Sequence, residues 1–405
     1  LMKRLAGTSA IVVAVSQFGS NENRAETILK AIQYVRNIWT YKHRLSGRIA
    51  FAGHSRGGEA AVTAAELNMA VNNVRSDAVI SIMPTDRNKG GEHPATLSGA
   101  ISKSFLALVA GKDEDVISYC IPNAVGCSTT IRNGFTLYDR VGTEWISNVW
   151  DYPIDKSVKL LPNLTHGNWI QFPGNQRKVV HDYVTRFIKW RLFDDLNQRD
   201  YFTGDKESSF TEGVVNQYSG HTTPSFIIDS FKLKNINKRE RGPSIFLGPA
   251  IFVKKSAQDQ DVTIPHVSNA LGIAWNSNTP SAAYWIFRHN QRSNTPIGIP
   301  TIDASVYDFL SFRITHVFFS PLNWGSNIRL RVRLIDLGYK SSDVLIGTNT
   351  SYPIPFGVLS KDIPAVSLGG TVVNTVINPM ATLRIPLSAF SNVNLKAIRS
   401  VSIHV

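Results

Sequence analysis

The residues best suited to do chemistry lie around Ser55, in the run Gly53-His54-Ser55-Arg56-Gly57. The apolar residues 49–52 before this run are typical of a short strand, and the Ala-rich residues after it are typical of a helix. A glycine on each side favours a turn sharp enough to expose the hydroxyl, because a Cβ at Gly53 or Gly57 would strike the neighbouring strand or helix. The start of the helix also stabilises negative charge beside the serine. The pattern predicts a nucleophilic serine; the alternative is a glycine-rich turn that carries an unreactive one.

A serine nucleophile needs a histidine to take its proton and a carboxylate to orient that histidine. Carboxylates follow the apolar residues 105–110, in the run Gly111-Lys112-Asp113-Glu114-Asp115-Val116. We expect Asp115 to be the orienting acid in preference to Asp113, because Asp115 lies four residues past the glycine and precedes an apolar residue that would return the loop to the core. The alternative is that all the carboxylates of this run are solvated loop acids.

The histidine is expected after a later apolar run, residues 158–161. His166 follows this run, and Trp169 comes soon after it, close enough to pack under the imidazole. We therefore expect His166 to be the base; the alternative is a capping or surface histidine. His181 lies one residue off the apolar face of an expected helix and is a weaker candidate, and His54 is expected to point into the core or the pocket wall.

These segments belong to an alternation of strands and helices over residues 1–195. Strands of a buried parallel sheet are expected as continuous apolar runs, and helices as runs with apolar residues on one face. The expected strands are residues 9–16, 49–52, 78–83, 105–110 and 158–161, and the main expected helices besides the Ala-rich one are residues 24–41 and 178–192. The alternation predicts an α/β fold, with a parallel sheet covered by helices on both faces.

The segment between the expected acid and base is long, and we interpret about residues 117–155 as an insertion. Cys120 and Cys127 would form a short-loop disulfide in an oxidising compartment, and no histidine lies beside them at metal-ligand spacing. Long insertions near catalytic sites often form lids, so we expect Trp145 and Trp150 to bind substrate together with Trp169. The alternative is that the aromatic residues form a small core of the insertion. They are Tyr119, Phe135, Tyr138, Trp145, Trp150 and Tyr152.

Three segments together resemble the α/β-hydrolases, namely residues 53–58, 111–116 and 166–169. The members that they resemble include dienelactone hydrolases, chlorophyllase-like proteins, platelet-activating-factor acetylhydrolases and bacterial cutinase-like polyester hydrolases. The resemblance covers about residues 1–195. It implies the α/β-hydrolase fold, with Ser55 as nucleophile, Asp115 as orienting acid and His166 as base. It also implies ester hydrolysis through an acyl-enzyme, with no cofactor.

The resemblance has one departure, which concerns the oxyanion hole. Residues 1–6 look like the tail of the helix that follows the family's oxyanion loop, so the upstream strands of the family sheet are expected to be missing from this chain. The backbone N–H of Arg56 would supply one oxyanion donor, while the second donor is absent from this sequence. The loss of one donor typically costs about 10²–10³ in rate. We therefore interpret the chain as a fragment of a longer product.

The pattern changes after a polar linker at residues 196–210. Short β-branched and aromatic runs separated by Gly, Pro, Asn and Ser predict an all-β sandwich over residues 211–405. Residues 303–313, 329–336 and 382–390, the last followed by residues 398–401, look similar to the jelly-roll sandwiches of carbohydrate-binding modules, which bind sugars by stacking on exposed aromatic rings. The candidate rings are Trp275, Tyr284, Trp285 and Trp324. The alternative is that these rings are core, in a sandwich that only packs against the hydrolase domain.

Composition and charge exclude some classes of function. The chain has 405 residues, of which 43% are hydrophobic and 18% charged, as in ordinary globular proteins. No run approaches the roughly 18 apolar residues of a membrane span. The net charge of +13 is spread along the sequence, whereas nucleic-acid-binding proteins usually concentrate it on one face or tail. Arg329, Arg331 and Arg333 alternate as in a strand, so we expect them on one solvated face.

Together these features predict a secreted serine esterase that acts on a bulky or polymer-linked ester. The paired cysteines and the accessory sandwich, with a carbohydrate as its possible ligand, favour secretion. Among enzymes, the alternative is a lipase or a peptidase-type acyl hydrolase. From a different class, the alternative is a catalytically inactive hydrolase fold that serves as a carbohydrate- or polymer-binding protein.

Overall fold

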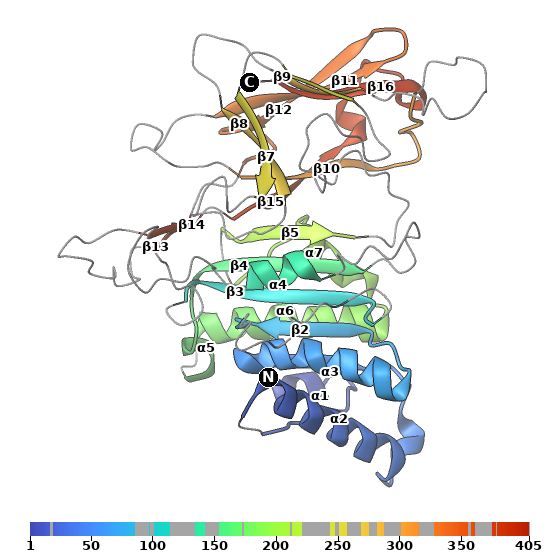
Figure 1. Ribbon diagram of the computed structural model, residues 1–405, viewed down its shortest axis with the longest axis vertical. Helices are drawn as coiled ribbons and strands as arrows, with labels where there is room; N and C mark the ends of the chain where they lie inside the picture. The colour runs from blue at the N-terminus through green and yellow to red at the C-terminus, as the bar shows by residue number, and fades with distance from the viewer. Residues whose placement is uncertain are drawn as a thin grey trace, which may run out of the picture. The chain divides into compact units, whose positions relative to one another are not determined.

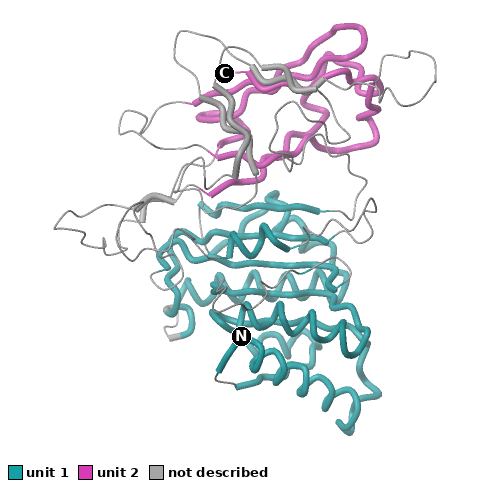
Figure 2. Tube along the Cα trace, in the orientation of Figure 1, with its two compact units in different colours: residues 1–222, 358–377 teal, residues 223–357, 378–405 magenta. Residues whose placement is uncertain are grey.

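The computed structural model divides the chain into two compact units (Figures 1 and 2). Unit 1 comprises residues 1–222 and 358–377, and unit 2 comprises residues 223–357 and 378–405. The structure describes residues 1–16, 19–85, 97, 101–113, 134–141, 154–171, 174–210, 213–220, 244–247, 251–256, 269–274, 282–286, 301–315, 328–354, 358–360, 375–377 and 379–404.

Unit 1 is built on a five-stranded sheet with the order β1-β2-β3-β4-β5 (Figure 1). Its strands are β1 (Ala50–His54), β2 (Ala78–Ile82), β3 (Ser104–Lys112), β4 (Asp155–Thr165) and β5 (Val215–Ser219). The first four are parallel and β5 is antiparallel to β4, so the sheet is mixed. All of β2 and most of β3 are buried, as expected for continuous apolar strands with helices on both faces.

Helices cover both faces of this sheet. The longer ones are α2 (Asn21–Asn37), α3 (Arg56–Asn72) and α6 (Asn175–Phe193). On β2, Ile80 and Ile82 share a core cluster with α6, while the alternate residue Ser81 donates to the backbone oxygen of Gly58 in α3. Because alternate residues of a strand point to opposite faces, α3 and α6 lie on opposite sides of the sheet. The short helices are α1 (Met2–Ala6), α4 (Gly134–Arg140), α5 (Asn168–Gln171), α7 (Asp200–Thr203), η1 (Lys42–Arg44) and η2 (Leu196–Gln198).

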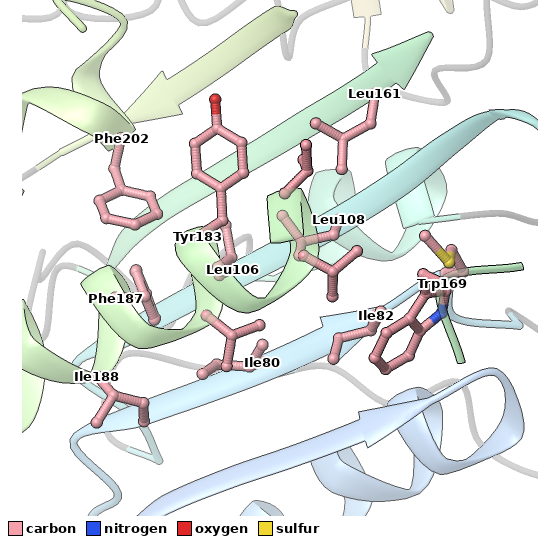
Figure 3. Packing of buried hydrophobic residues seen from close by; sticks show 14 of the residues in the cluster. Ile80, Ile82, Leu106, Leu108, Leu161, Trp169, Tyr183, Phe187, Ile188 and Phe202 are labelled. Carbon is pink, nitrogen blue, oxygen red and sulfur yellow. The ribbon is translucent and has the colours of Figure 1, made fainter. Parts of the chain in front are cut away.

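Aromatic rings of α6 and α7 fill the core on the α6 side of the sheet (Figure 3). Phe202 lies 5.0 Å from Phe187 and 6.2 Å from Tyr183 between ring centroids, and both pairs meet edge to face. The Lys159 side chain of β4 is buried in the same place, with its ammonium 5.3 Å from the centre of the Tyr183 ring. Burial lowers the pKa of Lys159 to about 7.

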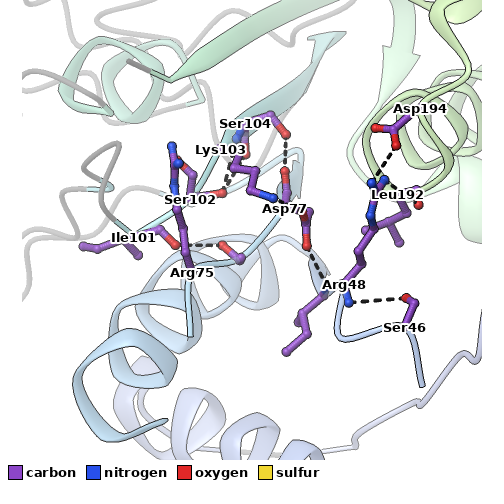
Figure 4. A network of polar contacts seen from close by, with 12 residues as sticks. Ser46, Arg48, Arg75, Asp77, Ile101, Ser102, Lys103, Ser104, Leu192 and Asp194 are labelled. Carbon is purple, nitrogen blue, oxygen red and sulfur yellow. Dashed lines mark hydrogen bonds and ion pairs between the residues drawn. The ribbon is translucent and has the colours of Figure 1, made fainter. Parts of the chain in front are cut away.

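A polar network ties together the segments that lead into the strands (Figure 4). The Asp77 carboxylate accepts from the backbone N–H of Ile49, just before β1, and from the ammonium of Lys103, just before β3. Arg48 pairs with Asp194 at the end of α6, and this contact lowers the pKa of Asp194. The network fixes the starts of the strands relative to one another, so their carboxyl ends meet in a set register.

Two features of unit 1 differ from the expectations. Residues 10–16 form no strand, and Ile11 and Val13 are exposed. An apolar run becomes a strand only where a neighbour takes up its N–H and C=O groups, and none of the described strands pairs with residues 10–16. At the other edge, residues 215–219 were expected in the second domain, but they pair with β4 as the fifth strand of this sheet.

The strands of unit 2 pair antiparallel throughout the described residues. A five-stranded sheet has the order β12-β11-β16-β9-β6, and two further pairs are β10-β15 and β7-β8. Side chains of β11, β12 and β16 share one core cluster with side chains of β10 and β15, as in a packed all-β domain. Their bounds are β6 (Ser244–Leu247), β7 (Ile251–Ser256), β8 (Asn269–Ala274), β9 (Ala282–Ile286), β10 (Phe309–Ile314), β11 (Arg329–Asp336), β12 (Ser341–Gly347), β15 (Ala381–Pro386) and β16 (Ile398–His404).

The arginines of β11 lie on one face of its sheet, as predicted. Arg329 and Arg331 are exposed and Arg333 is partly exposed, while Leu330 and Val332 between them are buried. Arg333 makes two hydrogen bonds to the Asp343 carboxylate, which hold the pKa of Asp343 below its ordinary value. A solvated, partly paired face therefore accounts for this cluster of charge.

The remaining pair of strands, β13 (Val358–Ser360) with β14 (Thr375–Ile377), is grouped with unit 1.

Candidate active site

Ser55 lies on a strained turn between β1 and α3. Its backbone has φ 56° and ψ −126°, a conformation that residues other than glycine rarely adopt. Three backbone hydrogen bonds hold it: Ser55 N–H donates to the carbonyl of Ile82 (2.9 Å), and its own carbonyl accepts from Gly58 N–H (2.8 Å) and Thr85 N–H (3.3 Å). Such strain persists where the surroundings enforce it, and it is common at functional sites. The turn expected from the sequence is therefore present.

The glycines around Ser55 differ in how much space a side chain would have. A Cβ on Gly53 would overlap the carbonyl oxygen of Gly57, so the backbones of β1 and α3 approach too closely for a side chain. The same expectation is wrong for Gly57, because a Cβ there meets nothing within 4 Å. Gly58 is the second constrained position, where a Cβ would lie 3.0 Å from the Cβ of Pro84. The sequence argument placed the second close approach one residue too early.

A buried hydrogen bond also reinforces the first turn of α3. Glu59 is buried there, and its carboxylate accepts a hydrogen bond from the hydroxyl of Thr85 (3.1 Å). Thr85 is the residue whose backbone N–H donates to the carbonyl of Ser55. The loop after β2 is thus attached to α3 by a side chain and to the Ser55 turn by the backbone. This double attachment makes the turn a rigid support for the Ser55 hydroxyl.

An acid and a histidine meet at the carboxyl ends of the next strands. Lys112 of β3 pairs with Thr165 of β4, so Asp113 and His166 follow these strands side by side. The carboxylate of Asp113 lies 3.0 Å from Nδ1 of His166. The side chains of Asp113 and His166 are 1% and 11% exposed. A carboxylate accepts, so Nδ1–H donates, and the neutral imidazole then carries its lone pair on Nε2.

This contact favours a different acid from the one expected. The sequence favoured Asp115, whereas the carboxylate that reaches His166 is that of Asp113. The reason is the length of β3, which continues to Lys112 instead of ending with the apolar run at Ala110. Asp113 therefore comes directly after the strand. Asp115 itself lies outside the described residues.

His54 connects the Ser55 turn to His166. Its ring centroid lies 4.7 Å from that of His166, and its Nε2 lies 2.9 Å from the backbone oxygen of His166. Because a carbonyl accepts, this Nε2 carries the proton. His54, the residue before the expected nucleophile, is thus hydrogen-bonded to the backbone of the expected base, His166. The sequence placed His54 in the core or the pocket wall and did not predict this contact, although its position beside Ser55 was the available signal.

Trp169 packs against His54, with 5.3 Å between ring centroids and an edge-to-face angle of 75°. It was expected to pack under the imidazole of His166 and to bind substrate, but the ring contact observed is with His54, and the side chain is buried. His181, the weaker candidate for the base, lies on α6 with its ring 6.4 Å from that of Trp169. Burial lowers the pKa of His181 to about 4.

The remaining predicted site residues fall into two groups. Arg56 begins α3, and the first N–H groups of a helix have no acceptor within the helix, so its N–H is placed to meet negative charge beside Ser55. The other group, Cys120, Cys127, Trp145 and Trp150, lies outside the described residues.

Two aromatic residues of the insertion are described: Phe135 and Tyr138 on α4 are buried, and α4 packs on β3 and β4. Of the candidate sugar-stacking rings, Tyr284 and Trp285 lie on β9, and Trp275 and Trp324 lie outside the described residues.

The described residues contain no group of three or more His, Cys, Asp or Glu side chains that could hold a metal ion. Within the same part of the chain, no helix has the length and apolar character needed to cross a membrane. No protein-family model matches the chain, and no curated protein sequence matches it.

Proposed function

We propose that this chain is a serine hydrolase with the α/β-hydrolase fold that cleaves carboxylic esters through an acyl-enzyme. Ser55 is the nucleophile, His166 the base and Asp113 the orienting acid. The observation that carries the proposal is the 3.0 Å contact between Asp113 and Nδ1 of His166, on a histidine whose ring packs against the neighbour of Ser55. The strained turn at Ser55 adds to it, because strain of this kind exposes a serine at the top of a sheet.

The chemistry follows from the protonation states. Nε2 of His166 takes the hydroxyl proton of Ser55 while Oγ bonds to the ester carbonyl carbon, and Asp113 stabilises the imidazolium that forms. The proton then passes to the leaving alcohol as the ester C–O bond breaks, which leaves an acyl group on Ser55. Water adds to this acyl group by the same route and releases the acid. The backbone N–H of Arg56 supplies one donor to the oxyanion.

The substrate that we propose is a bulky or polymer-linked ester, met outside the cytoplasm. The antiparallel strands of unit 2 are compatible with an accessory module that holds such a polymer, with carbohydrate as the proposed ligand. Hydrolysis of a dispersed polyester or an acylated polysaccharide, compared with a soluble ester of the same acyl group, tests the substrate class. A chain that cleaves only the soluble ester would contradict this part of the proposal.

The triad is tested by the hydrolysis of p-nitrophenyl acetate and butyrate. Ser55→Ala and His166→Ala should each lower kcat by about 10³-fold or more, and Asp113→Asn by about 10³–10⁴-fold because the wrong tautomer of His166 results. Asp115→Asn is the matched control, the same substitution two residues away, and its kcat should stay within about threefold of the parent. Loss of activity in the Asp115 variant with full activity in the Asp113 variant would reverse the assignment of the acid.

A fluorophosphonate probe separates the enzyme from the binding-protein alternative. An activated Ser55 should be labelled stoichiometrically, and labelling should vanish in Ser55→Ala. A serine that stays inert in a folded protein would contradict the proposal. That result would favour an inactive hydrolase fold whose role is to bind a polymer.

A further inference from the structure

We propose that His54 is a positioning residue of this site, which holds His166 so that its Nε2 faces Ser55. The inference rests on the proposed function and goes beyond its triad. His54 donates its Nε2–H to the backbone oxygen of His166 at 2.9 Å, and the two imidazole rings pack with centroids 4.7 Å apart and planes tilted by 43°. The same side chain therefore holds both the main chain and the ring of the base.

His54 restrains movements of His166 that the hydrogen bond to Asp113 does not prevent. The Asp113 contact fixes one atom of the His166 ring, Nδ1, but the imidazole can still rotate about that hydrogen bond, and the loop after β4 can still shift. The hydrogen bond to the carbonyl of His166 limits the shift, and the packed face of His54 limits the rotation. Together the two partners define the direction in which Nε2 of His166 points.

His54 is itself held firmly from two sides. It is the last residue of β1 and pairs with Ile82 in the parallel ladder, so its backbone is part of the sheet. On the side-chain end, the buried Trp169 contacts the His54 ring edge to face at 5.3 Å. Because both its backbone and its side chain are held, His54 can keep the His166 ring that it contacts in a fixed position. Because His54 directly precedes Ser55, movements of the nucleophile and of the base become coupled through one rigid residue.

A positioning role predicts a particular kinetic signature. A His54 variant keeps Ser55, His166 and Asp113, so substrate binding should change little. The alignment of Nε2 of His166 with the hydroxyl of Ser55 should, however, be poorer in the transition state. Misplacement by a fraction of an ångström to about 1 Å costs up to about 10²-fold in rate. We therefore expect kcat to fall about 10- to 10²-fold on loss of the hydrogen bond, with KM within about twofold of the parent.

Two substitutions of His54 separate the hydrogen bond from the ring contact. His54→Phe keeps a ring against His166 and removes the donor, and His54→Gln keeps an N–H donor at a similar reach and removes the ring. We expect His54→Phe to show the full fall in kcat, and His54→Gln to recover at least half of it on a logarithmic scale. The matched controls are His43→Phe and His43→Gln on the exposed η1 segment, which should keep the parent kcat. Equal kcat in the parent and both His54 variants would overturn the inference.

A measurement without substrate keeps the inference testable if the chain proves inactive. In the NMR spectrum of the ¹⁵N-labelled protein, the Nδ1–H of His166 should give a downfield signal that disappears in Asp113→Asn. In His54→Phe this signal should broaden or shift, while circular dichroism and the urea midpoint remain those of a folded protein. An unchanged signal would overturn the positioning role. An inactive parent with the expected His54 effect on this signal would instead contradict only the proposed esterase activity.

Discussion

Lys159 gives the sharpest test of the energetics of the first unit. Its side chain is 1% exposed, and its ammonium lies 5.3 Å and 5.8 Å from the ring centres of Tyr183 and Phe202. Burial lowers the pKa of Lys159 from 10.5 to about 7, against the opposing charges of Glu207 and Asp205. Burial in the core therefore destabilises the protonated form of Lys159 relative to the neutral amine.

The size of the effect follows from these values. The difference between 10.5 and about 7 is about 3.5, and at about 1.4 kcal/mol for each tenfold in affinity it corresponds to about 5 kcal/mol. A penalty of about 5 kcal/mol should therefore act on the folded state when the amine is protonated.

The sign of the pH dependence is fixed by which state holds the proton more firmly. Because the pKa of Lys159 is lower in the folded state, the unfolded chain binds more protons between pH 7 and pH 10.5. The contribution of this group to the free energy of unfolding therefore rises with pH through that window. Below pH 7 the penalty is present in full.

Lys159→Met removes the charge and keeps the length of the side chain. We expect its free energy of unfolding to exceed that of the parent by about 5 kcal/mol at pH 6, and the difference to shrink toward zero as the pH approaches 10.5. Urea denaturation followed by tryptophan fluorescence at pH 6, 8 and 9.5 measures this difference. Lys156→Met is the control, because Lys156 donates to the carbonyls of Tyr138 and Val141 and its loss should destabilise the protein. A Lys159 variant less stable than the parent at pH 6, or a difference independent of pH, would refute the reasoning.

Two further predictions concern backbone space and a buried ion pair. Gly53→Ala should cost more than about 4 kcal/mol or prevent folding, because its Cβ would overlap the carbonyl of Gly57, whereas Gly57→Ala meets no atom and should change stability by less than about 1 kcal/mol; equal melting temperatures for the two variants would contradict this. Asp155→Asn should cost about 3–5 kcal/mol in urea denaturation, because it removes the carboxylate 2.8 Å from Arg191, whose side chain is 12% exposed. An unchanged urea midpoint would show that the pair contributes little.

The parts of the fold that could be predicted are those with a strong local signal. The buried strands β2 and β3 are continuous apolar runs, and the turn at Ser55 follows from a strand, a close-packed glycine and a helix in immediate succession. His166 could be found because it follows an apolar strand at the expected edge of the sheet. In each case a few neighbouring residues carry the information.

The parts that could not be predicted depend on partners distant in the sequence. The apolar residues 9–16 have strand character, yet a strand needs a neighbour that the run itself does not specify. The sequence of β5 alternates buried and partly exposed residues with polar side chains, Gln217 among the buried ones, so its place beside β4 carries little hydrophobic signal. The carboxylate that reaches His166 lies two residues before the expected Asp115, because β3 continues past its apolar run to Lys112, where it pairs with Thr165 of β4.

The pairing of β5 with β4 also determines where unit 1 can be cut. A chain shortened at residue 195, where the helical pattern ends, would leave one edge of β4 without its partner and present its N–H and C=O groups to other molecules. A protease that cleaves between α7 and β5 would instead leave two pieces still joined through five paired residues of a buried strand. Such a nicked protein should elute as one species from a sizing column under native conditions and separate only in denaturant.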